Sequence, residues 1–396
     1  MASVVTSILL ARLLGPAGRG DVAAIVALVG LVAQLGGLGI GSAATLELGR
    51  TPENAARAGG LALLFPLVFA VGSFGAVLVA SAAGWTNHTP AILAIVVLWP
   101  AIQAAQINVQ GAFLGLGDYR WFNGSDLALR LSSLLLVALL WLGGRLTSDQ
   151  AVYALFVSES ATLVVSALVY WKRHGLEGPG QPGAWLAMLK LGMRSYIIQL
   201  PAFVLMRSDV LILRAYRGAA ETGVYAVAAQ LGNLMWLLPQ AFGHVLFSAL
   251  PRRDDMAEHT IRVAAVTGWL LTALGAVGLL AGPFAIRLVF GAAFAGSYTY
   301  FVVLLPGIVA LGVETVAVQY FNAEGFPIRI FWYWAAVTIT NVALNFIFDA
   351  RYGALAAALA STVCYVLMAG LILMRFQRIT NVSLRPLFIP ARNAFR

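Results

Sequence analysis

The amino-acid sequence predicts an all-α polytopic membrane protein with about twelve transmembrane helices in two six-helix lobes. Of its 396 residues, 61% are hydrophobic and only 10% are charged, whereas soluble domains carry about 25% charged residues. Apolar runs of about 20 residues recur, each long enough to cross a hydrocarbon core about 30 Å thick. Strict alternation of polar and apolar residues, the pattern of a transmembrane barrel, is absent.

Polar residues divide the chain into twelve apolar segments. They are residues 1–14, 22–46, 58–83, 90–115, 122–142, 150–171, 195–215, 223–247, 262–284, 299–321, 330–348 and 353–374. The first segment is too short to span a bilayer, so we expect the first helix to be clipped and the natural chain to begin upstream of Met1.

These segments predict four regions. Residues 1–171 form the N-terminal lobe, and residues 172–194 form a cytoplasmic linker with a Gly- and Pro-rich centre at 178–183. Residues 195–375 form the C-terminal lobe, and residues 376–396 form a basic cytoplasmic tail. We expect this tail and the linker to lie on the same side of the membrane.

The basic residues support this orientation. Alternate loops and the C-terminal tail hold 16 of the 25 Lys and Arg residues, and the opposite loops and adjoining helix ends hold 7. Basic residues favour cytoplasmic loops, so this bias predicts a cytoplasmic C-terminus. It also explains the net charge of +9 without a nucleic-acid partner. The remaining two, Arg130 and Arg207, lie inside predicted spans.

The two lobes repeat weakly in sequence. Residues 15–20 (GPAGRG) correspond to residues 218–223 (GAAETG) at an offset of 203, and residues 113–117 match residues 321–325 at an offset of 208. Both matches fall at equivalent places in the two halves. Because six is an even number of spans, the halves are predicted to be parallel repeats about an axis along the membrane normal.

Charged residues inside the spans are the first candidates for function, because charge at the centre of a bilayer is costly. Arg130 lies four residues after Asp126 on one helix face, and Arg207 lies two residues before Asp209. One interpretation is structural ion pairing, Asp126 with Arg130 and Arg207 with a neighbour such as Glu159. The other is that both arginines face a central cavity and bind an anion, since a guanidinium fork matches two phosphate oxygens.

Uncharged and acidic residues extend this candidate site. Gln103, Gln106 and Gln110 share a helix face inside an apolar span. They either form interhelical hydrogen bonds or contact sugar hydroxyls. The intramembrane carboxylates Asp209, Glu159 and Glu314 are candidates for proton or sodium coupling, with structural hydrogen bonding as the alternative for each.

Motifs of other function classes are missing. The sequence contains no Walker A loop and no H-E-x-x-H, and its four histidines are scattered. Pairs in the G-x-x-x-G pattern, such as Gly111/Gly115, indicate close helix packing. We expect no enzyme activity, no metal and no cofactor.

Three turns carry a resemblance to a known family. They are Ser7-Ile-Leu-Leu-Ala-Arg-Leu-Leu-Gly-Pro-Ala-Gly-Arg-Gly20, the stretch from Asp209 through Gly218 to Tyr225, and Gly291-Ala-Ala-Phe294. In these turns the chain resembles the Wzx-type polysaccharide transporters of the MATE-like MOP flippase superfamily. The resemblance covers nearly the whole chain.

The resemblance implies a flippase that moves undecaprenyl-pyrophosphate-linked oligosaccharide across the bacterial inner membrane by alternating access. We further expect membrane lipids and the lipid-linked oligosaccharide as partners, H+ or Na+ as coupling ion, and a polysaccharide polymerase or glycosyltransferases as further partners. Two alternatives stay open. One is a cation-coupled exporter of small molecules with the same fold, and the other is a membrane-embedded polysaccharide polymerase or ligase.

Overall fold

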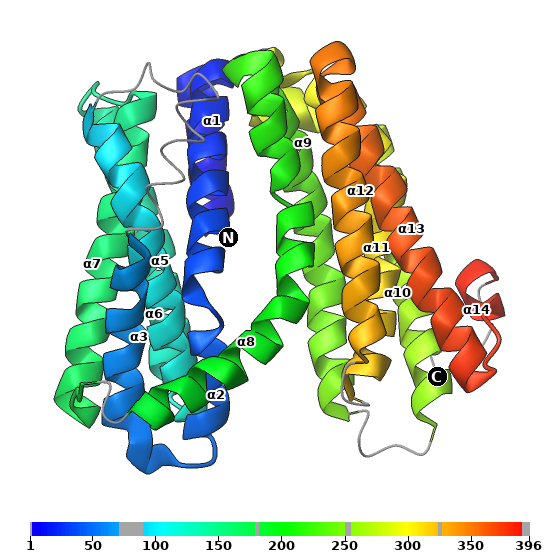
Figure 1. The fold of residues 1–396 in the computed structure, drawn as a ribbon. Coiled ribbons are helices and arrows are strands. Elements are labelled where there is room, and N and C mark those ends of the chain that lie inside the picture. The colour runs from blue at the N-terminus through cyan, green and yellow to red at the C-terminus, as the bar shows by residue number, and fades with distance from the viewer. Residues whose placement is uncertain (1, 71–89, 179–181, 250–254, 324–326, 390–396) are drawn as a thin grey trace. The chain divides into compact units, whose positions relative to one another are not determined.

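A computed structural model describes residues 2–70, 90–178, 182–249, 255–323 and 327–389. Within these ranges the chain is helical apart from short connections (Figure 1). Eight of the described helices are long and apolar enough to cross a membrane. The chain is therefore a multi-pass membrane protein of the predicted all-α class. Part of predicted segment 58–83 lies outside the described residues.

The chain divides into two compact units, residues 1–207 and 208–396. Unit 1 consists of α1 (Ala2–Gly37), α2 (Ile40–Leu48), the short helix η1 (Pro52–Asn54), α3 (Ala55–Ala70), α5 (Pro90–Gly115), α6 (Tyr119–Leu142), α7 (Ser148–His174) and α8 (Pro182–Leu205). Unit 2 consists of α9 (Ser208–Ala249), α10 (Met256–Val289), η4 (Ala292–Phe294), α11 (Ser297–Ala323), α12 (Ile328–Tyr352), α13 (Ala354–Thr380) and α14 (Arg385–Phe388).

The first helix of each unit bends at a glycine. In α1 the bend is at Gly15, with φ 66° and ψ −176°, and in α9 it is at Gly218, with φ 79° and ψ −179°. Both conformations lie at positive φ, where a side chain is strained and glycine is not. These are the two glycines that open the matched sequence stretches, so the weak repeat in sequence has a counterpart in backbone geometry.

A second pair of matched positions has the same surroundings in the two units. Phe113 and Phe321 are both fully buried. The ring of Phe113 meets Tyr170 of α7 edge-on at 5.3 Å, and the ring of Phe321 meets Phe376 of α13 edge-on at 6.5 Å. Each phenylalanine thus joins the C-terminal part of one helix to that of another helix in its own unit.

One close helix contact in unit 1 joins α2 to α5. A Cβ built on Gly111 would lie 2.2 Å from the backbone oxygen of Gly41, and one on Gly115 would lie 2.8 Å from the oxygen of Ala44. Two side chains fix the same contact: Asn108 accepts a hydrogen bond from the Gly41 amide at 2.9 Å, and Thr45 donates one to the Gly111 carbonyl at 2.8 Å. The Gly111/Gly115 pair therefore serves helix packing, as its spacing indicates.

Helix α8 packs on α2 of unit 1. Gly39, which lies in the break between α1 and α2 at φ 70°, faces Gly192 of α8, and a Cβ on Gly192 would lie 2.6 Å from the Gly39 oxygen. From the sequence, residues 182–194 are predicted to belong to the linker and residues 195–205 to the second lobe. In the structure they form one helix whose contacts place it in unit 1.

In unit 2, α11 packs against α9, α10 and α13. Its buried residues include Leu304, Ile308 and Leu311. Large apolar side chains on the outside, such as Leu280 and Phe284 of α10, are exposed. An apolar exterior is expected of helices whose solvent is lipid.

Candidate functional site: polar groups buried in each helical unit

Arg130 and Asp126 form an ion pair on α6. The Arg130 Nε atom lies 2.6 Å from Asp126 Oδ2, and Nη2 lies 2.9 Å from Oδ1. This two-bond geometry is the strongest form of the arginine–carboxylate contact. The side chains are 44% and 47% exposed. The structure therefore contains the ion pair that the four-residue spacing suggests, with the guanidinium engaged by its neighbour.

Arg207 lies between α8 and α9, at the end of unit 1. Its guanidinium carbon is 5.9 Å from the ring centroid of Phe203, a cation–π distance. Among the ion pairs of the described residues, none joins Arg207 to Glu159. Arg207 is half-buried.

The three glutamines of α5 have different surroundings. Gln110 donates a hydrogen bond from Nε2 to Ser125 Oγ of α6 at 3.1 Å. Gln106 is 2% exposed, and neither its amide oxygen nor its amide nitrogen has a hydrogen-bond partner. The amide oxygen of Gln103 is likewise buried without a partner. Gln103 and Gln106 thus hold hydrogen-bonding capacity that the protein leaves unused.

Glu159 of α7 lies beside these glutamines. Its Oε2 atom accepts a hydrogen bond from the indole Nε1 of Trp99 at 2.7 Å, and Gln103 is its second polar neighbour. The carboxyl group is 6% exposed. We call Trp99, Gln103, Gln106 and Glu159 the unit 1 polar cluster.

Gly30 of α1 connects this cluster with Arg207. A Cβ on Gly30 would lie 3.8 Å from Gln103 Oε1 and 3.7 Å from the ring tip of Phe203. The glycine thus leaves room where α1, α5 and α8 meet. Because Phe203 also carries the cation–π contact of Arg207, the structure brings Arg207 to the same region of unit 1 as Gln103.

Unit 2 contains a second buried polar group around Asp209. This residue is in the first turn of α9 and is 4% exposed. Its Oδ1 accepts from the Val210 amide at 2.7 Å, and its Oδ2 accepts from the Tyr225 hydroxyl at 2.5 Å. The Asp209 carboxylate is therefore held by donors from its own helix turn and from Tyr225.

Asp349 of α12 is an acidic neighbour of Asp209 in unit 2. It lies in the last turn of α12 and is completely buried, and neither of its oxygens has a hydrogen-bond partner. Asp209 and Glu221 are the charged groups nearest to it. Glu221 is engaged elsewhere, by Arg217 and by the amide of Ala354.

Two neutral side chains of unit 2 are also fully buried. They are Asn345, one turn before Asp349 on α12, and Ser361 of α13, and within the described chain the Asn345 Oδ1 atom has no hydrogen-bond partner. Ser361 lies beside Tyr225, which holds Asp209. We call Asp209, Asp349, Asn345 and Ser361 the unit 2 acidic site. An unpaired buried carboxylate is unfavourable unless a cation or a proton neutralises it.

Oxygen donors of this type suit small hard cations. Carboxylate, amide and hydroxyl oxygens are the ligands of such ions, and helix C-terminal ends contribute to Na+ sites in transporters. The described residues contain no group of three or more His, Cys, Asp or Glu side chains placed to hold a metal. The acidic site combines two carboxylates with neutral oxygens.

Glu314 lies apart from both groups. It is 1% exposed on α11, and its Oε1 atom has no partner. Its neighbours in sequence, Val313 and Val316, belong to an apolar cluster with Leu246 and Ala264.

Sequence reasoning missed Asp349, Ser361 and Trp99 as site residues. Predicted segment 330–348 ends one residue before Asp349, so this aspartate is counted outside the span. The four-residue spacing from Asn345 to Asp349 was a usable signal, since it places both side chains on one helix face. Ser361 and Trp99 lie in apolar stretches of sequence, and no motif or spacing there indicates either residue as part of a site.

Comparisons with known proteins agree with this picture of the fold. Residues 1–252 match the sequence family described as polysaccharide biosynthesis protein. A relative named probable flippase AglR, from Haloferax volcanii, is 28% identical over 265 residues. That match covers 60% of this chain and 50% of the relative, so the chain spans about half the length of the relative.

Two solved structures share the fold over nearly their whole lengths. An inward-facing multidrug resistance MATE family transporter of the MOP superfamily matches with a TM-score of 0.75 and 17% identity, covering 96% of this chain and 95% of its own. The lipid II flippase MurJ, in an inward closed conformation, matches with a TM-score of 0.74 and 12% identity, covering 98% and 87%. The predicted MATE-like fold is confirmed. Because its model matches residues 1–252, more than half of the sequence, this chain belongs to the polysaccharide biosynthesis protein family.

Proposed function

We propose that this protein is a flippase that moves an oligosaccharide linked to undecaprenyl pyrophosphate across the bacterial inner membrane, for surface-polysaccharide biosynthesis. Membership of the polysaccharide biosynthesis family and the transporter fold support this proposal. The observation that carries it is the unit 1 polar cluster, in which buried amides with unused hydrogen-bonding capacity lie near a half-buried arginine.

The chemistry of such a cargo fits these groups. Sugar hydroxyls both donate and accept hydrogen bonds, and the amides of Gln103 and Gln106 do the same. Pyrophosphate would be held by Arg207, whose guanidinium now contacts only an aromatic ring among the described groups. Arg130, Asp126 and Gln110 are further candidates, although binding phosphate at Arg130 requires it to leave Asp126.

The unit 2 acidic site is the proposed place of ion coupling. A Na+ ion or a proton bound at Asp349 would neutralise a carboxylate that no group among the described residues pairs. A bound ion stabilises whichever state of the transporter completes the site, and this differential affinity is what drives alternating access. Glu159 and Glu314 are the other candidate proton sites.

The proposed activity forms and breaks no covalent bond. The protein acts as a transporter, not an enzyme, and its product would pass to a polysaccharide polymerase. Glycosyltransferases would supply its substrate.

The test is translocation in proteoliposomes. The purified chain is reconstituted with fluorescent undecaprenyl-pyrophosphate oligosaccharide, and the fraction of lipid reached by an external quencher is followed with time. We expect wild type to equilibrate the two leaflets and Arg207→Ala to slow this at least tenfold, the loss expected for one charge-assisted contact of about 1.5–3 kcal/mol. Arg145→Ala, an exposed change in the hairpin between α6 and α7, is the matched control and should behave as wild type.

Three results would contradict the proposal. The first is an Arg207→Ala rate equal to wild type. The second is transport of small organic cations without movement of the lipid, which would favour the exporter. The third is transfer of glycan to a new acceptor, which would favour a polymerase or ligase.

A further inference from the structure

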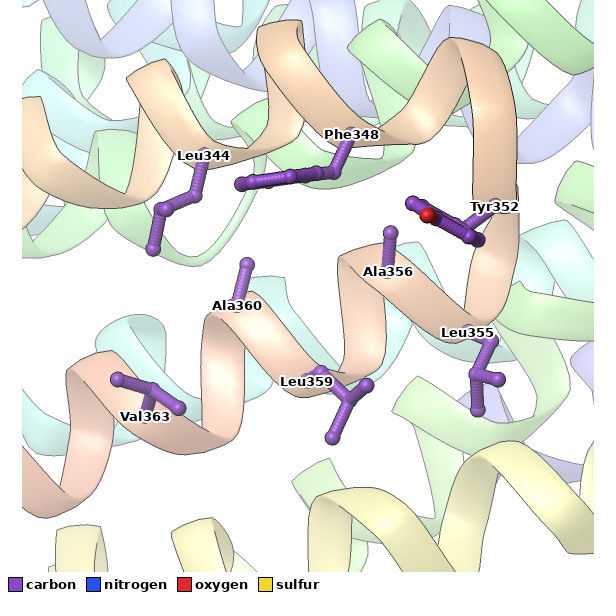
Figure 2. Close-up of a pocket in the computed structure, with 8 residues that line it drawn as sticks. All are labelled: Leu344, Phe348, Tyr352, Leu355, Ala356, Leu359, Ala360 and Val363. Atoms are coloured by element: carbon purple, nitrogen blue, oxygen red, sulfur yellow. The ribbon is translucent and has the colours of Figure 1, made fainter.

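An apolar groove runs between α12 and α13 on the surface of unit 2 (Figure 2). Its volume is about 360 Å³, and no polar surface lines it. We call this the α12–α13 groove, and its lining residues are Leu344, Phe348, Tyr352, Leu355, Ala356, Leu359, Ala360 and Val363.

Small residues of α13 create the groove. In Figure 2 the side chains of Ala356 and Ala360 point from α13 toward Leu344 and Phe348 of α12, and the methyl groups leave the space between the helices unfilled. The groove is open to the outside, since Phe348 is 42% and Val363 is 55% exposed. Both helices are long and apolar enough to span a membrane.

A positively charged side chain, Arg351, lies at one end of this groove. Arg351 is exposed in the last turn of α12, and its guanidinium carbon is 5.3 Å from the ring centroid of Tyr352, a lining residue. Within the described chain no carboxylate pairs with Arg351, because the nearby Glu221 is held by Arg217 at 2.9 Å and by the Ala354 amide at 2.7 Å. An apolar channel that ends at an unpaired guanidinium is complementary to a lipid with an anionic headgroup.

We propose that the α12–α13 groove binds one acyl chain of an anionic phospholipid, with the lipid phosphate at Arg351. The groove opens to the surrounding bilayer, where phospholipid is the bulk component, so mass action favours phospholipid over a scarce cargo lipid. The predicted orientation puts Arg351 on the side away from the cytoplasm, so the lipid belongs to the outer leaflet. This site is separate from the unit 1 polar cluster and does not depend on the proposed transport activity.

The experiment is native mass spectrometry of the full chain in detergent, titrated with phosphatidylglycerol or phosphatidylcholine. We expect wild type to retain one phosphatidylglycerol with a preference of about fivefold over phosphatidylcholine, the effect of about 1 kcal/mol from one basic residue near an anionic lipid. Arg351→Gln should abolish the preference, whereas Arg287→Gln, at another exposed helix end, should keep it. Ala360→Phe should fill the groove and reduce binding of both lipids, and Ala281→Phe on the exposed face of α10 is its control.

Each outcome decides the proposal. If Arg351→Gln keeps the wild-type melting temperature and loses the preference for phosphatidylglycerol, the contact between Arg351 and the headgroup is supported. This result holds even if Ala360→Phe fails to fold. Equal binding of the two phospholipids by wild type would overturn the proposal, as would unchanged binding by a folded Ala360→Phe variant. Displacement of phosphatidylglycerol by equimolar undecaprenyl pyrophosphate would also overturn it, because the groove would then belong to the cargo.

Discussion

Replacing Asp349 with Asn removes one negative charge and leaves the shape of the side chain almost unchanged. Asp349 is fully buried, and its two oxygens have no hydrogen-bond partner. A bound cation at 100 times its Kd would stabilise the wild-type protein by about 2.7 kcal/mol. For a cooperative unit of about 150–250 residues, the size class of unit 2, this corresponds to a rise in Tm of roughly 5–11 °C.

The assay is thermal unfolding of the purified chain in detergent, followed by intrinsic fluorescence in NaCl and in choline chloride at equal ionic strength. We expect the wild-type Tm to rise with Na+ and the Asp349→Asn variant to show no such rise. In choline chloride the variant should be the more stable protein, because an unpaired buried carboxylate costs several kcal/mol. Asp126→Asn, which removes an exposed carboxylate, should keep the full response to Na+.

A proton at the site gives a different pattern. The wild-type Tm is then the same with and without Na+, and it rises as the pH falls because protonation removes the buried charge. The Asp349→Asn variant should show no such dependence of its Tm on pH. The reasoning is refuted when wild type and Asp349→Asn respond identically to both Na+ and pH. The unit 2 acidic site would then be a static part of the core.

Two further predictions concern unit 1. Gly111→Ala should lower the free energy of unfolding by about 1–3 kcal/mol, the usual cost of overpacking, since the new Cβ would lie 2.2 Å from the Gly41 oxygen. Gly124→Ala is the control: nothing lies within 4 Å of its Cβ position, so the Tm should be unchanged or higher. Trp99→Phe should cost about 1–3 kcal/mol, because Glu159 loses its 2.7 Å donor while remaining buried. Adding Glu159→Gln should recover part of that loss, and a double-mutant cycle with no coupling between the two sites would contradict the contact.

Much of the fold could be predicted from local sequence. The bilayer fixes how long an apolar run must be, so segments such as 122–142 and 299–321 fall inside observed helices α6 and α11. The positions of the two helix bends could also be predicted. Gly15 and Gly218 are the first residues of the two matching sequence stretches, and only glycine adopts their positive φ without strain. The ion pair between Asp126 and Arg130 follows from spacing on one helix.

The candidate site was predictable only in part. Gln103, Gln106 and Asp209 stand out in sequence because polar side chains are rare in apolar spans. Asp349 did not stand out, because its position at the end of α12 looks solvated until neighbouring helices cover it. The direction of Glu159 toward Trp99 likewise depends on how α7 packs against α5.

The sequence by itself determined that the chain is a two-part bundle of membrane-spanning helices, since helix length, turn chemistry and charge bias are local properties read against a bilayer of fixed thickness. Only the tertiary structure decided which polar groups are buried together. Asp209, Asp349 and Ser361 come from three helices far apart in the chain, and their burial together depends on helix contacts that no local pattern encodes.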